Sequence, residues 1–136
     1  MKRFFLLLTC FFISISAFSQ NIYVDSASSC LSSCNGTSWG TAFNKLQDAL
    51  GVASAGDTVF VAKGTYYPDE GVGYINNNRL QYFEIPDSVV LYGGYPNGGG
   101  VRDWSQNPTI LSGDIDQNGY HSGNTAHVIY TEYVSD

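Results

Sequence analysis

The chain has 136 residues, of which 12 are acidic and 6 are basic, and its net charge is −6 at pH 7. This charge argues against nucleic acids and anionic membrane surfaces as partners, because both attract basic patches. The 15 glycines and 10 tyrosines are typical of a β-rich, turn-rich extracellular domain, and the acidic balance is compatible with binding cations.

The pattern of a secretory signal peptide covers residues 1–19. A basic start precedes the apolar run "FFLLLTCFFISI", and small residues at Ala17 and Ser19 favour cleavage before Gln20. The run is shorter than the about 20 residues that cross a bilayer. Lipid attachment at Cys10 is the second interpretation. We therefore expect a bacterial protein that is secreted or displayed at the cell surface, with four basic and twelve acidic residues in its mature part, a net charge of −8.

A first strand is expected at "NIYV", residues 21–24, and a cysteine pair follows it. In an oxidising compartment, Cys30 and Cys34 most simply form a structural disulfide within their serine-rich loop. Redox chemistry is the weaker alternative, because the redox motif has two residues between its cysteines and here there are three. Zinc binding is also weaker, because His121 and His127 are far away in the sequence.

One amphipathic helix is predicted within "GTSWGTAFNKLQDALGVASAGD". Its apolar residues recur at spacings of three and four, and Thr37 or Ser38 is expected to cap its start. Because such a helix has one apolar face, we expect it to cover the open end of a β-structure and its strand edges. Residues 20–57 would thus form an N-terminal strand and cap. The apolar face holds Trp39, Phe43, Leu46, Leu50 and Ala53, and the polar face holds Asn44, Lys45, Gln47 and Asp48.

Residues 58–136 contain four similar segments, each with a β-branched or apolar core. The first three continue to Gly64, Gly93 and Gly113. Recurrence of a strand and turn at about 20 residues is typical of a solenoid, and apolar runs without alternation favour parallel strands. A Gly/Asn-rich insertion at residues 66–83 lengthens the first interval, and such insertions often form binding surfaces. The segments begin at Thr58, Ser88, Pro108 and Ala126.

Several motifs together resemble the N-terminal part of bacterial secreted parallel β-helix proteins of the pectate-lyase-like superfamily, including polymorphic outer-membrane and adhesin-type surface proteins. They are "IYVD", "AFNKLQDAL", "AGDTVFVAKGTYYP", "LYGGY", "RDWSQNPTILSGDI" and "HVIY", and they cover nearly the whole mature chain. The resemblance implies an all-β fold, a right-handed parallel β-helix with one N-terminal capping α-helix. Since family members continue for more coils and often end in a sorting domain, it also implies that this sequence is a fragment.

The function we expect is non-catalytic: a structural or adhesive surface module that binds an extracellular glycan or a surface protein. The alternative is a polysaccharide lyase or glycoside hydrolase whose catalytic coils lie beyond residue 136, because one scaffold supports many functions. Asp114 and Asp116 are two residues apart and would share one side of a strand. Hydrolases of this superfamily show an adjacent Asp pair, a Gly-His-Gly and an R-x-K, none of which occurs here. We therefore assign no catalytic residue.

The stretch "DIDQNG" has the beginning of a calcium-binding loop, with Asp114, Asp116 and Asn118 as oxygen ligands. The twelfth position of such a loop is a bidentate acid, and here it is Thr125. A helix–loop–helix site is therefore excluded, and a polar turn is favoured over a weak calcium site. No other cofactor is expected.

The tyrosines in and beside the insertion are candidates for binding, because a phenol ring combines an apolar body with a polar tip. The alternative is that tyrosine simply suits a half-exposed strand. The candidate residues are Tyr66, Tyr67, Tyr74, Tyr82, Tyr92 and Tyr95.

Overall fold

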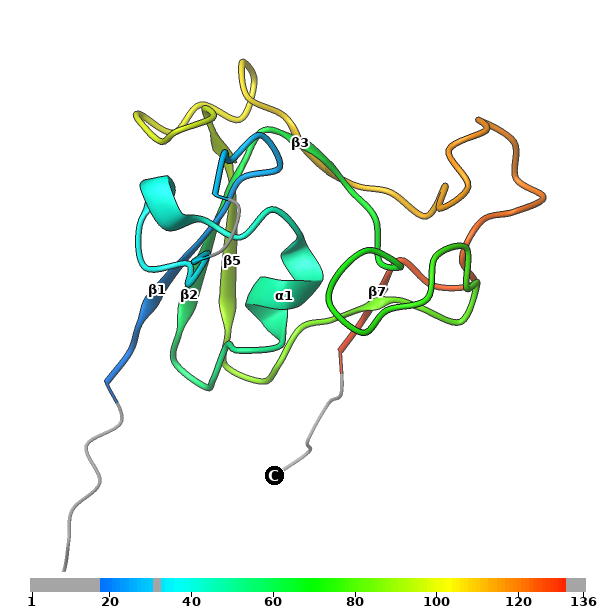
Figure 1. Ribbon diagram of the computed structural model, residues 1–136, viewed down its shortest axis with the longest axis horizontal. Coiled ribbons are helices and arrows are strands. Elements are labelled where there is room, and N and C mark those ends of the chain that lie inside the picture. Colours follow the sequence, from blue (N-terminus) through cyan, green and yellow to red (C-terminus); the bar gives the residue numbers. More distant parts are fainter. Residues whose placement is uncertain (1–17, 31–32, 132–136) are drawn as a thin grey trace, which may run out of the picture.

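The computed structural model describes residues 18–30 and 33–131 of the chain (Figure 1). Residues 1–17 of the predicted signal peptide lie outside this part. The described residues form seven strands, one α-helix and one 3₁₀ helix, and every strand pair is parallel. The fold is therefore mainly β with a lone α-helix, in agreement with the predicted all-β class.

The largest sheet has three strands in the order β1-β2-β5. In its register Ile22 pairs with Val59, and Val59 pairs with Leu91. Alternate positions point to opposite faces of a strand, so the neighbours Tyr23 and Phe60 point away from the core. The strands are β1 (Asn21–Val24), β2 (Thr58–Ala62) and β5 (Val90–Tyr95).

Two shorter sheets each contain two strands, β3 with β6 and β4 with β7. The strands β2, β3 and β4 therefore occur in the same order as β5, β6 and β7, and each pairs with its counterpart. The strands are β3 (Gly64–Tyr66), β4 (Phe83–Glu84), β6 (Thr109–Leu111) and β7 (Ile129–Tyr130).

This pairing corrects the predicted repeat of about 20 residues. The segments that begin at Thr58 and Ser88 do stack on each other, as β2 and β5. The segments that begin at Pro108 and Ala126 instead pair with β3 and β4, which the sequence pattern did not resolve. One set of three strands, β2, β3 and β4, therefore pairs with a second set, β5, β6 and β7, and the four similar segments do not stack on one another in sequence order.

Each set of three strands has a long loop between its second and third strands, and the second set has another, residues 96–108, between β5 and β6. Residues 67–82, here the first corner loop, connect β3 to β4, and residues 112–128, the second corner loop, connect β6 to β7. The predicted insertion at 66–83 is thus matched by a loop of nearly equal length in the next set. Figure 1 shows both corner loops, in green and orange, on the side away from the β1-β2-β5 sheet.

The predicted continuous helix is interrupted. A 3₁₀ turn, η1 (Trp39–Thr41), precedes the α-helix α1 (Leu46–Leu50), and the backbone between them is extended. The cause is a competing strand-like pairing: the N–H of Phe43 donates to the carbonyl oxygen of Tyr23, and the N–H of Asp25 donates to that of Phe43. The expected side-chain cap is also absent at Ser38.

The core contains the helix residues for which the sequence predicted burial. Leu46 is 1% exposed and Leu50 is 5% exposed, and both belong to one cluster with Val59 and Val61. Tyr66 and Phe83, at the two ends of the first corner loop, complete the cluster. The core therefore fixes both ends of this loop beside α1.

Candidate functional site

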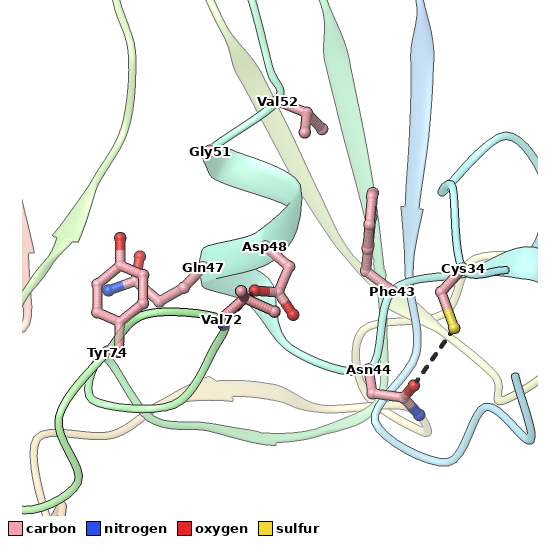
Figure 2. Close-up of a pocket in the computed structure, with 9 residues that line it drawn as sticks. All are labelled: Cys34, Phe43, Asn44, Gln47, Asp48, Gly51, Val52, Val72 and Tyr74. Carbon is pink, nitrogen blue, oxygen red and sulfur yellow. Dashed lines mark hydrogen bonds between the residues drawn. The ribbon is translucent and has the colours of Figure 1, made fainter. Parts of the chain in front are cut away.

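An open pocket of about 670 Å³ lies between α1 and the first corner loop (Figure 2). We call it the α1 groove. Figure 2 shows Tyr74 and Val72 of the loop on one side of α1 and Cys34 on the other. The lining residues are Cys34, Phe43, Asn44, Gln47, Asp48, Gly51, Val52, Val72 and Tyr74.

Gln47 attaches the loop to the helix at both ends of the loop. Its side-chain amide donates to the carbonyl oxygen of Pro68 at 2.5 Å and to that of Tyr82 at 2.9 Å. Gln47 is buried, so its expected place on a solvent-facing polar side of the helix is wrong. Because a buried carbonyl without a donor is costly, these two bonds hold the first corner loop against α1.

Two charged side chains near Gln47 add to this attachment. Asp48 accepts a hydrogen bond of 2.7 Å from the backbone N–H of Val72 through Oδ1. Lys45 forms a salt bridge of 2.6 Å with Glu70. Gly71 lies close to α1: a Cβ on it would lie 3.0 Å from both the Asp48 carboxylate and Cβ of Gln47. This wall of the groove is therefore fixed by side chains of the helix.

The opposite wall contains Cys34. A disulfide joins Cys30 to Cys34, with Cα atoms 5.6 Å apart. The Cys34 sulfur lies 4.0 Å from Oδ1 of Asn44, the contact drawn in Figure 2, and a disulfide sulfur has no proton to donate. The amide nitrogen of Asn44 donates to the carbonyl oxygen of Ser28 at 2.7 Å. Asn44 Oδ1 is thus an acceptor at the groove.

Tyr74 provides the aromatic surface of the groove. Its side chain also lines a smaller neighbouring pocket of about 160 Å³ with Glu84 and Pro86, so the ring lies between two hollows. Burial raises the pKa of the Tyr74 phenol, and the nearby carboxylates of Glu84 and Asp48 raise it further. The hydroxyl therefore stays protonated at neutral pH and can donate a hydrogen bond.

The structure separates the other predicted tyrosines. Tyr66 belongs to the core, where its hydroxyl donates to the carbonyl oxygen of Ala62 at 3.0 Å. Tyr67 is half-buried beside it. Tyr82 packs against Tyr130, with ring centroids 5.3 Å apart. Of the six predicted tyrosines, Tyr74 alone lines the α1 groove.

Tyr92 and Tyr95 belong to an aromatic ladder on the outer face of β1-β2-β5. Tyr23 stacks on Phe60 at 5.4 Å, and Phe60 stacks on Tyr92 at 6.1 Å. The Arg102 guanidinium lies 5.6 Å above the Tyr92 ring. The rings of this ladder cover one another's faces. The ladder therefore stabilises the stacking of the strands and does not offer a free ring face to a ligand. Sequence reasoning missed Tyr23 and Phe60, whose shared face appears once the register is known. It placed Trp39 on the core-facing side of the capping helix, which is wrong, because the Trp39 ring packs against Tyr23 and Tyr95 of this ladder.

The "DIDQNG" stretch forms a turn in which its own polar groups are partners. Oδ2 of Asp114 accepts from the N–H of Gly119 at 3.0 Å, and Oδ1 of Asn118 accepts from the N–H of Tyr120 at 2.7 Å. The amide nitrogen of Asn118 donates to Asp116 at 2.7 Å. Asp114 and Asp116 thus lie in a turn and not on one side of a strand, and Oδ1 of Asp114 is buried without a hydrogen-bond partner.

No family model, curated protein or solved structure matches this chain. Within residues 18–30 and 33–131, no group of three or more His, Cys, Asp or Glu side chains could hold a metal ion. In the same residues, no helix has the length and apolar character needed to span a bilayer.

Proposed function

We propose that this protein is an exported right-handed parallel β-helix module with a structural and adhesive role, and that its α1 groove binds a neutral glycan without catalysis. The observation that carries the proposal is the position of Tyr74, whose ring borders a groove with carboxylate and amide oxygens at its wall.

The parallel pairing supports the β-helix. Successive sets of three strands stack in three parallel sheets, as repeated coils of one solenoid would. Leu46 and Leu50 bury an apolar helix face against the first strands, which suits a cap on the first coil. An exported scaffold of this kind agrees with the signal-peptide pattern of residues 1–19 and with the resemblance to surface-displayed β-helices.

The size and lining of the groove suit a small sugar unit. Its volume of about 670 Å³ is within the range of about 300–1,000 Å³ for small-ligand sites. A pyranose has one face of C–H groups that packs against the negative face of an aromatic ring, and Tyr74 is not stacked on another ring among the described residues.

Polar groups around the ring match sugar hydroxyls. Asn44 Oδ1 and Asp48 Oδ2 are acceptors at the groove, and the Tyr74 hydroxyl is a donor. The position of Asp48 is fixed because its other oxygen holds the N–H of Val72. A preorganised acceptor of this kind favours binding, since little conformational entropy remains to be lost.

The local charge favours a neutral glycan over an acidic one. The carboxylates of Asp48 and Glu84 both act on Tyr74. A uronate-rich polymer would place its own carboxylates beside these groups, and like charges at short distance repel. This charge also disfavours the polyuronate-lyase alternative for this groove.

The test is a screen of the exported protein against immobilised neutral and uronate-containing polysaccharides, followed by calorimetry with an oligosaccharide from the best polymer. Tyr74→Ala is expected to weaken binding about tenfold, the equivalent of about 1.4 kcal/mol, and Tyr74→Phe to retain most of it because the ring remains. Tyr120→Ala is the matched control, since Tyr120 is 72% exposed and lies in the second corner loop.

Binding confined to uronate polymers would contradict the proposed specificity. Equal losses in Tyr74→Ala and Tyr120→Ala, or unchanged affinity in Tyr74→Ala, would contradict the proposed site.

A further inference from the structure

The two corner loops carry aspartates at equivalent positions. Tyr66 pairs with Leu111 in the last register pair of β3 and β6, and the N–H of Ser112 still donates to the carbonyl oxygen of Tyr66 at 2.9 Å. Asp69 lies three residues after Tyr66, and Asp114 lies three residues after Leu111. Both aspartates therefore lie in the loops that leave the same edge of the β3-β6 sheet.

Both aspartates make the same contacts. One oxygen of each accepts a backbone N–H of its own loop: Asn77 donates to Oδ2 of Asp69 at 2.7 Å, and Gly119 donates to Oδ2 of Asp114 at 3.0 Å. Oδ1 of each is buried and has no hydrogen-bond partner. Asp69 is only 2% exposed as a whole residue.

A third buried oxygen without a partner comes from Asn124, through its Oδ1. The N–H of Thr125 donates to the carbonyl oxygen of Gly113 at 2.8 Å, so Asn124 lies beside the chain that leads into Asp114. The Asp116 carboxylate packs against Gly123, the preceding residue. Asp69, Asp114 and Asn124 are the complete set of buried side-chain acceptors without a partner among the described residues.

The charges near these oxygens are mostly acidic. Burial raises the pKa of Tyr67, and Asp114, Glu70 and Asp69 raise it further, so carboxylates of both loops act on one phenol. Arg79 is the basic side chain at this corner, where its Nε donates to the carbonyl oxygen of Asn124 at 2.8 Å. Among the described residues, the Arg79 guanidinium is not within salt-bridge distance of a carboxylate, and the salt bridge there joins Lys45 to Glu70.

We propose that Asp69, Asp114 and Asn124 form a site for one hard divalent cation, Ca²⁺, between the two corner loops. One oxygen of each carboxylate and the amide oxygen of Asn124 are buried without a donor, and a positive partner would compensate them, because burial of an unpaired charge is costly. A water molecule donates only two hydrogens, whereas Ca²⁺ accepts six to eight oxygens in irregular geometry, including backbone carbonyls and water. This assignment replaces Asp116 and Asn118 of the predicted motif with Asp69 and Asn124, and keeps Asp114.

The site would join successive sets of strands through their loops. With two charged ligands, its affinity is expected in the weak extracellular range of about 10⁻⁴ to 10⁻³ M, which suits a secreted protein. The experiment uses the exported protein, with Tb³⁺ as a luminescent probe sensitised by nearby tyrosine and Ca²⁺ as the competitor, together with thermal melts in Ca²⁺ and in EDTA.

Asp69→Asn is expected to weaken Ca²⁺ binding about tenfold or more and to remove the Ca²⁺-dependent rise in melting temperature. In EDTA the same variant should melt at or above the wild-type temperature, because it loses a buried unpaired charge. Asn124→Asp adds a charged ligand and should tighten Ca²⁺ binding. Asp116→Asn is the control and should leave affinity within about threefold, since Asp116 is exposed.

Two results would overturn the proposal. One is the absence of Tb³⁺ luminescence and of a melting shift up to about 10 mM Ca²⁺, well above the expected range. The other is loss of binding in Asp116→Asn with binding preserved in Asp69→Asn, which would move the site to the "DIDQNG" turn. Circular dichroism would reveal a misfolded Asp69→Asn variant. In that case the Asn124→Asp variant decides, and Ca²⁺ binding by this variant that is unchanged or weaker than in wild type rejects the site.

Discussion

Gln47 of α1 donates a hydrogen bond of 2.9 Å to the carbonyl oxygen of Tyr82, 35 residues further along the chain. A second bond from the same amide reaches Pro68, so one side chain holds both ends of the first corner loop. This contact makes the α1 groove a fixed feature, since the loop that forms one wall is attached to the helix that forms its floor.

Gln47→Ala is expected to lower the free energy of unfolding by about 1–3 kcal/mol, because it leaves two carbonyl groups without a donor. Urea unfolding of the protein measures the change. Gln106→Ala is the control, since Gln106 is exposed, and it should stay within about 0.5 kcal/mol of wild type. Equal stability of both variants would show that the loop does not depend on Gln47.

Leu46→Ala should cost about 2–5 kcal/mol, because Leu46 is fully buried between the helix and the first strands. Leu80→Ala is the matched control, since Leu80 is 78% exposed in the first corner loop. A thermal melt of Leu46→Ala that coincides with wild type would argue against a packed cap.

The aromatic ladder predicts an energetic coupling between Phe60 and Tyr92, whose rings stack at 6.1 Å. A double-mutant cycle with leucine at each position should give a coupling of about 0.5–1.5 kcal/mol between the two rings. Additive losses in free energy of unfolding would show that the two rings contribute independently and that the ladder has no role of its own.

Asp57 predicts a specific acid sensitivity. Its carboxyl pKa is lowered by hydrogen bonds from the backbone N–H groups of Gln20 and Ser54. A carboxyl with a lowered pKa stabilises the fold fully above its ordinary pKa of 3.8, and this stabilisation is lost as the pH falls through the lowered value. Unfolding free energies measured from pH 5 down to about pH 2 should therefore fall less steeply in Asp57→Asn than in wild type.

The sequence predicted those elements whose hydrophobic pattern lies within one short segment of the chain. The spacing of Leu46 and Leu50 identified a helix that packs on the core, and the apolar run from Thr58 identified β2. The predicted extent of the helix was wrong because Phe43 pairs with Val24 of β1, and the periodicity within the helical segment carries no information about a partner in an earlier strand.

The groove could not be predicted, because contacts distant in sequence build it. Gln47 looked like a surface residue at helical spacing, and its burial follows from where Pro68 and Tyr82 lie. The strands β3 and β4 have three and two residues, too few to show an alternation. Tyr74 was among the candidate tyrosines, yet nothing in the sequence distinguished it from the buried Tyr66.

The central claim, that the α1 groove binds a neutral glycan, is tested most directly by amide NMR of the protein during titration with a neutral oligosaccharide. The account predicts shifts concentrated at Asp48, Gly51 and Val72, with Tyr74 ring signals moving at the same ligand concentration, and unchanged signals at Ile110 and Ile129 on β6 and β7. Shifts confined to β6 and β7, or no shift at saturating concentrations of every neutral oligosaccharide derived from the screen, would contradict it.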